Sequence, residues 1–511
     1  MDNSQNHIGY FHQMPVTDKH LSVELNSDFS LPDYQPEIRR LLSTRVNIIP
    51  PSEYADNGGA SFEGTVNYKI LYLGADGKLY STSLSDKYSF SIPIDFNSHS
   101  INNDEITLIP SCKCENVSTR VLGPRKLNVR TKLHCHALAL SPSLYSPHIV
   151  GTHNNASIES LVLDTPALSV KKCTSQPIAL NDFISLDSHM DDMRIIDINS
   201  GVSISECSAT TDKINVRGEV VLKILYCNDL QSDYPLTLVR KIPLTSTLQC
   251  EGINNSFDCS ASGNIIDEQI NIDEGGVKLE ISLVVTAMGQ KNENVPYIND
   301  AYSTERSSEN KNMEVPIFQS VKCSNGNLSQ NEVFSVEEIK LSPDAKIIDV
   351  SSHPTINELN WENEKLVLTG VCEHQLIYHL DEEYTTKELS APFRYEVDMR
   401  SSSASPSILK WNASACASHS RARCDGDRLF IDCELNFGIS LQKEAKISVL
   451  DEMILGEKLD KCSGELLLCY PDKEATLWSV AKQYAIPQRK IKAQNSIPEN
   501  EQTIKKKFLI I

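Results

Sequence analysis

One segment of the sequence occurs three times at a nearly constant spacing. Gly64-Thr-Val-Asn-Tyr-Lys-Ile-Leu-Tyr72 is followed by the similar Gly218-Glu-Val-Val-Leu-Lys-Ile-Leu-Tyr226 and by the looser Gly370-Val-Cys-Glu-His-Gln-Leu-Ile-Tyr378. The offset from glycine to tyrosine is 8 residues in each copy, and the glycines are 154 and 152 residues apart. A period this long is typical of duplicated domains, because solenoid units repeat every 20 to about 45 residues. The sequence therefore predicts three copies of one domain.

Each copy consists of short apolar or alternating runs that are separated by turn residues. Ala75-Asp-Gly-Lys78 contains the Asp-Gly pair of a tight hairpin turn, and no long helical period is present. These features predict a mainly β fold with three tandem β-sandwich-like units, and a small barrel is the alternative for each unit. A single helical turn is expected near Pro36, Asp191 and Pro343, because a proline or an acid suits a helix N-terminus.

Polar stretches divide the copies and define the expected boundaries. Residues 151–157 and the Ser- and Asn-rich residues 294–312 are predicted to be solvated linkers. The assigned segments are an N-terminal tail at 1–19, three repeats at 20–150, 165–293 and 316–450, and a different C-terminal module at 463–511.

The charge and the cysteines limit the possible partners and compartments. The 511 residues include 48 Lys+Arg and 68 Asp+Glu, a formal net charge of −20, which disfavours nucleic acid and anionic lipid as partners. The first residues lack a signal-peptide pattern, and no apolar run reaches the length of a membrane span. Fifteen cysteines, an odd number in a chain without such a signal, favour a reducing compartment. We therefore expect a cytoplasmic protein.

Neither a catalytic site nor a metal site is expected. The sequence lacks the phosphate-loop, zinc-protease, nucleophile-elbow and dinucleotide-binding motifs. Cys112 and Cys114 are too close together for a zinc knuckle, and His134 and His136, which share a strand face, read as solvent-side residues. We expect no enzymatic activity and no cofactor.

The recurring glycines and tyrosines are interpreted as structural landmarks. A glycine inside a strand usually marks a bulge or a close approach of backbone, and a tyrosine that closes an apolar strand places its ring in the core. The landmarks are Gly64, Tyr72, Gly218, Tyr226, Gly370 and Tyr378.

The C-terminal module has a different pattern. A short apolar strand ends at Tyr470, Thr476 is a plausible N-cap, and Leu477, Val480, Ala481 and Tyr484 follow helical spacing. A second helix begins at Pro487, and Phe508-Leu-Ile-Ile511 ends the chain as a strand. The expected order is βααβ.

This module resembles the LysM domain in its aromatic-ended strand, its Thr-Leu pair, its Asn495 after the second helix and its apolar last strand. It departs from the LysM pattern in two loops, at residues 473–475 and 505–507, which flank the groove where LysM domains hold N-acetylglucosamine oligomers. The Gly-X-Val-X-X-Lys-Ile-Leu-Tyr segment is similar to the SPOCS signature. Together, SPOCS repeats and a terminal LysM resemble the SipL-like family of spore coat morphogenesis proteins.

The resemblance implies a non-enzymatic scaffold or adaptor in spore coat (envelope) morphogenesis. Such a protein acts in the mother-cell cytoplasm at the forespore surface and docks through its LysM domain onto stage IV sporulation protein A, the coat ATPase, with other coat proteins as further partners. The alternative is a protein that binds peptidoglycan, an N-acetylglucosamine polymer, in the spore cortex or cell wall. Weak glycan binding by the LysM domain is compatible with the first function.

Charge and side-chain pattern suggest how the module binds. Residues 473–511 have a net charge of +5 and the rest of the chain −25, a contrast that suits docking on an acidic protein patch. Trp478 lies off the apolar stripe of its helix and is expected to be partly exposed. The strand beginning at Leu466 is apolar on both faces, so one face is expected to meet a partner. The candidate partner-binding residues are Trp478, Lys482, Leu466, Arg489 and Asn495.

Overall fold

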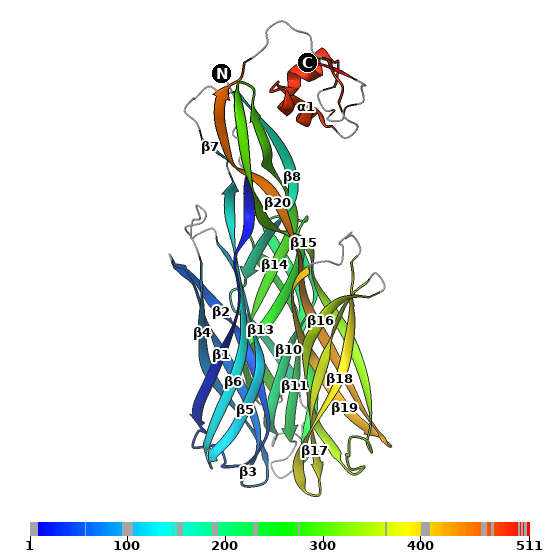
Figure 1. Ribbon diagram of the computed structural model, residues 1–511. Helices are drawn as coiled ribbons and strands as arrows, with labels where there is room; N and C mark the ends of the chain where they lie inside the picture. Colours follow the sequence, from blue (N-terminus) through cyan, green and yellow to red (C-terminus); the bar gives the residue numbers. More distant parts are fainter. Residues whose placement is uncertain are drawn as a thin grey trace.

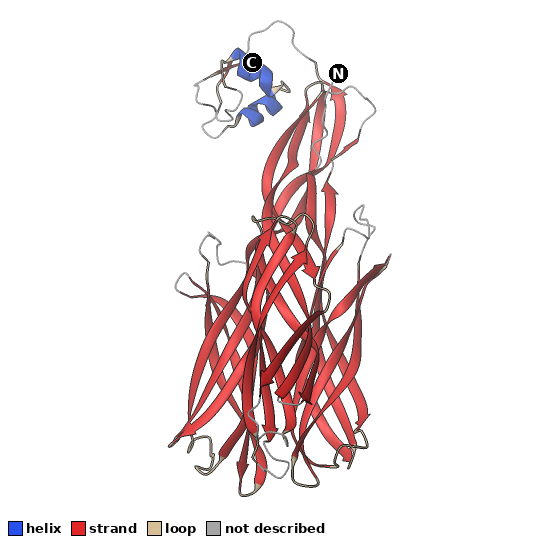
Figure 2. Ribbon diagram, turned by 180° about the vertical axis from the view of Figure 1, so that it is seen from behind, coloured by secondary structure: helices blue, strands red, loops and turns tan. Residues whose placement is uncertain are grey.

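The computed structural model is almost entirely β-strand (Figures 1 and 2). It describes residues 9–56, 58–94, 106–145, 147–150, 157–185, 193–227, 234–273, 276–362, 365–399, 409–460, 468–471, 475–498, 501, 504 and 508–511. The mainly β fold class is confirmed. In this part of the chain the cysteines are free thiols, and no helix is long and apolar enough to cross a membrane.

Six sheets of the described chain form three pairs with one common strand order. The first pair contains β1 (Gly9–Ser30), β6 (Lys126–Tyr145) and β5 (Thr107–Gly123), facing β2 (Ile38–Asp56), β3 (Gly59–Gly74) and β4 (Leu79–Pro93). The second contains β8 (Ile158–Thr174), β9 (Ile178–Ser185), β14 (Gly276–Ser303) and β13 (Asp258–Asp273), facing β10 (Arg194–Thr210), β11 (Lys213–Cys227) and β12 (Leu236–Gln249). The third contains β15 (Arg306–Ser335), β20 (Arg428–Lys458) and β19 (Leu409–Asp425), facing β16 (Lys346–Glu362), β17 (Lys365–Leu380) and β18 (Glu383–Val397). Neighbouring strands in these sheets are antiparallel, except that the short β7 (His148–Val150) runs parallel to β20.

Alternating side chains form the core between the two sheets of each pair. On β3, Phe62, Val66 and Tyr68 point into the first pair and are almost fully buried against residues of β6 such as Leu127 and Leu133. This period of two is the pattern of a strand with one face on a core. Each pair therefore packs as a β-sandwich.

The three recurring glycines lie where an edge strand bulges. A Cβ at Gly218 would lie 2.1 Å from the carbonyl oxygen of Ser203, and one at Gly370 would lie 2.1 Å from that of Thr355. At Gly64 a Cβ would instead meet the ring of Tyr88 at 2.4 Å. The pairing register shifts beside each of these positions. Close approach of neighbouring groups thus explains the glycines.

The recurring tyrosines contribute to the cores. Tyr72 is fully buried and its hydroxyl donates to the carbonyl oxygen of Pro36 at 3.3 Å. Tyr378 is buried, and Tyr226 is partly buried against the second core. The repeat landmarks therefore have structural roles here.

Equivalent residues of the three pairs meet in one apolar cluster at the centre of the body. Leu42, Ile196 and Ile348 have the same spacing as the recurring glycines, and so do Leu71, Leu225 and Ile377; all six belong to this cluster. Near the C-terminal end of β3, residues such as Leu71 point away from the core of their own sandwich. They are apolar because this face packs against the neighbouring sandwiches.

Polar bonds close the three sandwiches into a ring. The Ser81 hydroxyl donates to the Ile196 carbonyl oxygen at 2.7 Å, from the first pair to the second. Thr237 makes the equivalent bond to Ile348 at 3.5 Å, from the second pair to the third. Arg40 of the first pair donates to the Tyr384 carbonyl oxygen of the third at 3.5 Å. Each sandwich therefore contacts both of the others.

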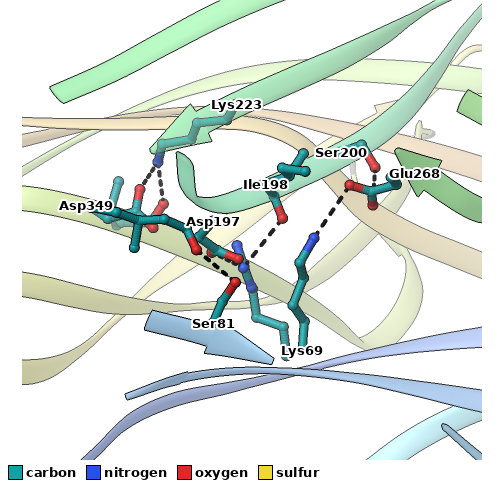
Figure 3. A network of polar contacts seen from close by, with 11 residues as sticks. Lys69, Ser81, Asp197, Ile198, Ser200, Lys223, Glu268 and Asp349 are labelled. Carbon is teal, nitrogen blue, oxygen red and sulfur yellow. Dashed lines mark hydrogen bonds and ion pairs between the residues drawn. The ribbon is translucent and has the colours of Figure 1, made fainter. Parts of the chain in front are cut away.

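Buried charges join the same interfaces (Figure 3). Arg45 pairs with Asp197, and Lys223 pairs with Asp349, with side chains at most 11% exposed. Lys223 also donates to the carbonyl oxygens of Val350 at 2.8 Å and Ser420 at 3.1 Å. Burial lowers the pKa of Arg45, but the carboxylates of Asp197 and Asp349 outweigh burial and hold it above its usual value. These pairs lock neighbouring sandwiches in register.

The position equivalent to Lys223 in the third repeat is Gln375, whose amide donates to the carbonyl oxygen of Leu42 at 3.5 Å. The equivalent of Asp349 in the first repeat is Ser43, which is also buried. At the interface between the third and first sandwiches, neutral side chains therefore occupy the places of the buried Lys223–Asp349 pair.

The long strands of the second and third pairs extend beyond the sandwiches as a narrow arm, formed by parts of β8, β14, β15 and β20 (Figure 1). Ile298 and Ala301 of β14 pack against Leu450 and Met453 of β20 inside the arm. The prediction that residues 294–312 form a solvated linker is wrong, because all but two of them belong to β14 and β15. In the other expected linker, residues 151–156 lie outside the described residues.

The expected single helical turns are also not helical. Residues 343–344 form a single hydrogen-bonded turn, and strands follow where helix was expected, with β2 beginning at Ile38, β10 at Arg194 and β16 at Lys346. Asp191 lies outside the described residues. The apolar residues in these segments enter the cores, and this burial overrides the N-terminal helix signals.

We predict that Asp349→Ala destabilises the body strongly. The substitution leaves the Lys223 ammonium, on a side chain that is 11% exposed, without its carboxylate partner, and removing one partner of a buried pair typically costs about 3–5 kcal/mol. The midpoint of urea unfolding, followed by circular dichroism, measures the effect.

Two variants provide controls. Glu314→Ala removes a partner of an exposed pair with Lys446, whose side chains are 72% and 65% exposed, and should shift the midpoint far less. Lys223→Gln combined with Asp349→Ser reproduces the neutral residues of the equivalent positions, Gln375 and Ser43, and should recover most of the loss. Equal midpoints for Asp349→Ala and Glu314→Ala would contradict the role assigned to the buried pair.

Candidate partner-binding module

The C-terminal module is a small two-stranded sheet with two helices. Strand β21 (Leu468–Cys469) pairs antiparallel with β22 (Leu509–Ile510), and helices α1 (Leu477–Gln483) and α2 (Gln488–Gln494) lie between them in the chain. The expected βααβ order is therefore present. Thr476 caps α1 as predicted, because its hydroxyl accepts from the Ser479 backbone at 3.1 Å and the Ser479 hydroxyl accepts from the Thr476 backbone at 3.0 Å.

Asn495 joins α2 to the last strand and is 3% exposed. Its amide group donates to the carbonyl oxygens of Ile491 at 2.9 Å and Ile510 at 2.7 Å. Its carbonyl oxygen accepts from the Ile510 backbone at 2.8 Å. Asn495 is therefore a structural residue of the module, and its side chain is not accessible to a partner, contrary to the sequence-based prediction.

The module contacts the tip of the arm through Trp478. The indole nitrogen donates to Asp300 Oδ2 at 2.8 Å, and the ring meets the edge of Tyr302 with centroids 5.0 Å apart. The expectation that Trp478 is partly exposed is wrong, since it is 7% exposed. It is off the internal stripe of its helix, as predicted, but the arm covers it.

Lys482 completes the contact from the same helix. Its ammonium group lies 2.6 Å and 2.8 Å from the two carboxylate oxygens of Asp300. Burial raises the pKa of Asp300, but the hydrogen bonds from Lys482 and Trp478 outweigh burial and hold this pKa below its usual value. The carboxylate is therefore charged at neutral pH and has two donors from the module.

Helix α2 and the loop before it add two smaller contacts. The Tyr302 hydroxyl donates to the Ile486 carbonyl oxygen at 2.8 Å. Glu159 of β8 accepts a backbone hydrogen bond from Gln488 and feels the charge of Arg489, although burial, the larger effect, raises its pKa. Arg489 itself is exposed. The basic module thus contacts two acidic side chains of its own chain, Asp300 and Glu159.

The sequence-based site is therefore only partly assembled. Trp478 and Lys482 share one contact, Arg489 lies beside it, Asn495 is internal to the module, and Leu466 lies outside the described residues. Sequence reasoning missed Glu159, Asp300 and Tyr302, because the last two fall in the expected linker. The apolar residues Val295-Pro-Tyr-Ile298 were a signal for a strand there.

A second surface of the module is apolar and exposed. Leu468, Tyr470 and Phe508 are 46%, 72% and 45% exposed, and the two rings lie 6.2 Å apart. Cys469, the strand neighbour of Leu468, is buried. The first strand thus has an apolar side chain on its outer face, as the sequence suggested for its uncovered side.

Two other polar features of the described chain are structural. Asp18, His20 and His136 bring one possible metal-ligand atom each to within 4.8 Å of one another. However, Asp18 bonds His136 and Lys410, both at 2.8 Å, and His20 bonds His134 at 3.2 Å, so these groups satisfy one another. The rings of His20 and His136 are stacked 15° from parallel, with centroids 4.3 Å apart.

The second feature is a cavity of about 1190 Å³ between the three sandwiches. Its cationic side chains are engaged within the chain. Arg45 and Lys223 form the buried pairs described above, Lys69 lies 3.5 Å from Glu268, and Lys113 donates to the Ala413 carbonyl oxygen at 2.7 Å. The cavity wall therefore holds the sandwiches together.

Asn495→Ala should destabilise the module, because it leaves the backbone N–H and carbonyl groups of Ile510 without their side-chain partner and removes one of the two hydrogen bonds to the Ile491 carbonyl oxygen. Each unsatisfied group costs about 1–3 kcal/mol. Hydrogen exchange measures the effect: the amides of α2 should exchange faster in the full-length variant than in the native chain. Gln494→Ala, the exposed neighbouring amide, is the matched control and should leave exchange nearly unchanged; equal exchange in both variants would contradict the structural role.

Comparison with known proteins identifies one segment. Residues 193–273 match the model of the SipL, SPOCS domain family, and this segment contains β10, β11, β12 and β13. No curated protein and no solved structure matches the chain. The match supports a SipL-like protein with a SPOCS domain at residues 193–273.

Proposed function

We propose that this chain is a non-enzymatic scaffold or adaptor in the morphogenesis of the spore coat. It acts in the mother-cell cytoplasm at the forespore surface, where its C-terminal module, a LysM domain, docks onto stage IV sporulation protein A. The observation that carries this proposal is the SPOCS match at residues 193–273 in a chain that ends in a LysM-like βααβ module.

The equivalence of the three sandwiches supports three SPOCS domains. The matched strands β10–β13 correspond to β2–β5 in the first pair and to β16–β19 in the third. The recurring glycine occupies the same place, beside a register shift, in all three. A ring of three such domains is a rigid base, and the arm carries the module away from it (Figure 1).

The features of the module favour a protein as its partner over a glycan. Its charge suits an acidic surface, and its contact with Asp300 is an example of such recognition by Trp478 and Lys482. The two loops that depart from the LysM pattern are those that flank the glycan groove.

The proposal predicts saturable binding of stage IV sporulation protein A by the full-length chain. Isothermal titration or surface plasmon resonance with the purified proteins measures this affinity. A chain that ends at Lys461 should lose binding while its sandwiches remain folded, as judged by far-ultraviolet circular dichroism. Muropeptides and N-acetylglucosamine oligomers should not compete.

The opposite pattern would overturn the proposal. Saturable binding of N-acetylglucosamine oligomers, without binding of stage IV sporulation protein A, would assign the protein to cortex or cell-wall glycan instead. Undiminished binding of stage IV sporulation protein A by the shortened chain would move the docking site to the sandwiches.

A further inference from the structure

The module rests on the arm through a small set of residues. Its described contacts with the rest of the chain involve Glu159 and Leu161 of β8 and Asp300 and Tyr302 of β14. The sandwiches, by contrast, share apolar clusters and buried ion pairs. Small and partly polar interfaces of this kind are typical of transient contacts between domains.

The contact has the chemistry of a specific recognition site. One carboxylate accepts from an indole nitrogen and from an ammonium group, and an aromatic ring beside the carboxylate meets the edge of the indole. Lys482 is 38% exposed and Asp300 is 22% exposed, so water has access to the ion pair. The module can therefore exchange this carboxylate for another without first opening a dry core.

We propose that the arm tip is a latch, and that the Trp478 and Lys482 face of the module binds a partner that presents an acidic side chain beside an aromatic ring, as Asp300 and Tyr302 do. This inference rests on the proposed function, because it names the binding face of the same module. The latched module hides the face, and the released module exposes it.

The tether makes such a weak contact effective. The module follows Lys458, the last residue of β20, on the same arm that carries Asp300. A short tether produces an effective concentration of order mM, so the latch is populated even when its intrinsic affinity is low. A partner must compete with this local acid, and its apparent affinity falls in proportion to the released fraction.

Asp300→Lys tests the latch from the arm side and leaves the module unchanged. The lysine removes the acceptor of Trp478 and repels Lys482, so the amides of α1 should exchange hydrogen at least about fivefold faster than in the native chain. The released chain should bind stage IV sporulation protein A about tenfold more tightly. Glu309→Lys, an equal charge change at an exposed position of β15, is the matched control and should alter neither measurement.

A charge exchange separates the latch from the partner face. Lys482→Asp alone should release the module and weaken binding of stage IV sporulation protein A. Asp300→Lys together with Lys482→Asp restores an ion pair, so α1 should regain slow exchange while binding of the partner stays weak. If Lys482 only stabilised the module, the double variant would not combine slow exchange of α1 with weak binding of the partner.

The outcomes are distinguishable. Unchanged exchange of α1 in Asp300→Lys would overturn the latch, and faster exchange with unchanged partner affinity would overturn the competition. Absence of partner binding by the native chain and all variants would overturn the proposed function, while the exchange of α1 would still decide whether the module is latched.

Discussion

The body depends on the interface between neighbouring sandwiches. At this interface apolar residues of the three sandwiches meet in one cluster, and a charged side chain reaches from one sandwich to the next. Leu42, Ile196 and Ile348 meet there, and Lys223 and Asp349 join the second and third sandwiches beside them. A head-to-tail contact between copies forms a closed ring when the rotation from each copy to the next adds up to a full turn. The threefold duplication supplies the three copies that this ring contains. The duplicated sequence thus encodes both the sandwich and its own assembly surface.

The arm exists because some strands of the second and third copies are longer than their equivalents in the first copy. Strands β14, β15 and β20 contain 28, 30 and 31 residues, whereas β1 and β6 of the first pair contain 22 and 20. The additional residues form a two-layered support above the ring, and the C-terminal module rests on its tip. This arrangement suits the proposed scaffold, in which the base fixes the position and the module binds the partner.

Sequence reasoning found the features that depend on local pattern. The spacing of Gly64, Gly218 and Gly370 indicated the duplication, alternation indicated sandwiches, and Thr476 indicated the start of α1. It mistook residues 294–312 for a linker, because the arm is thin and one face of each strand is exposed, so the polar half of the pattern dominates the composition. The error about Trp478 has a related cause. The apolar stripe of α1 indicates which side chains pack inside the module. Trp478 is buried instead by Asp300 and Tyr302, which are far away in the sequence. No local pattern encodes such a contact.

The most direct measurement of the central claim is co-purification from sporulating cells, with tagged full-length protein and a tagged chain that ends before Cys462. The full-length protein should recover stage IV sporulation protein A, and the shortened chain should lose it at equal expression. Recovery of stage IV sporulation protein A by both chains, or by neither, would contradict a role for the C-terminal module in docking this scaffold.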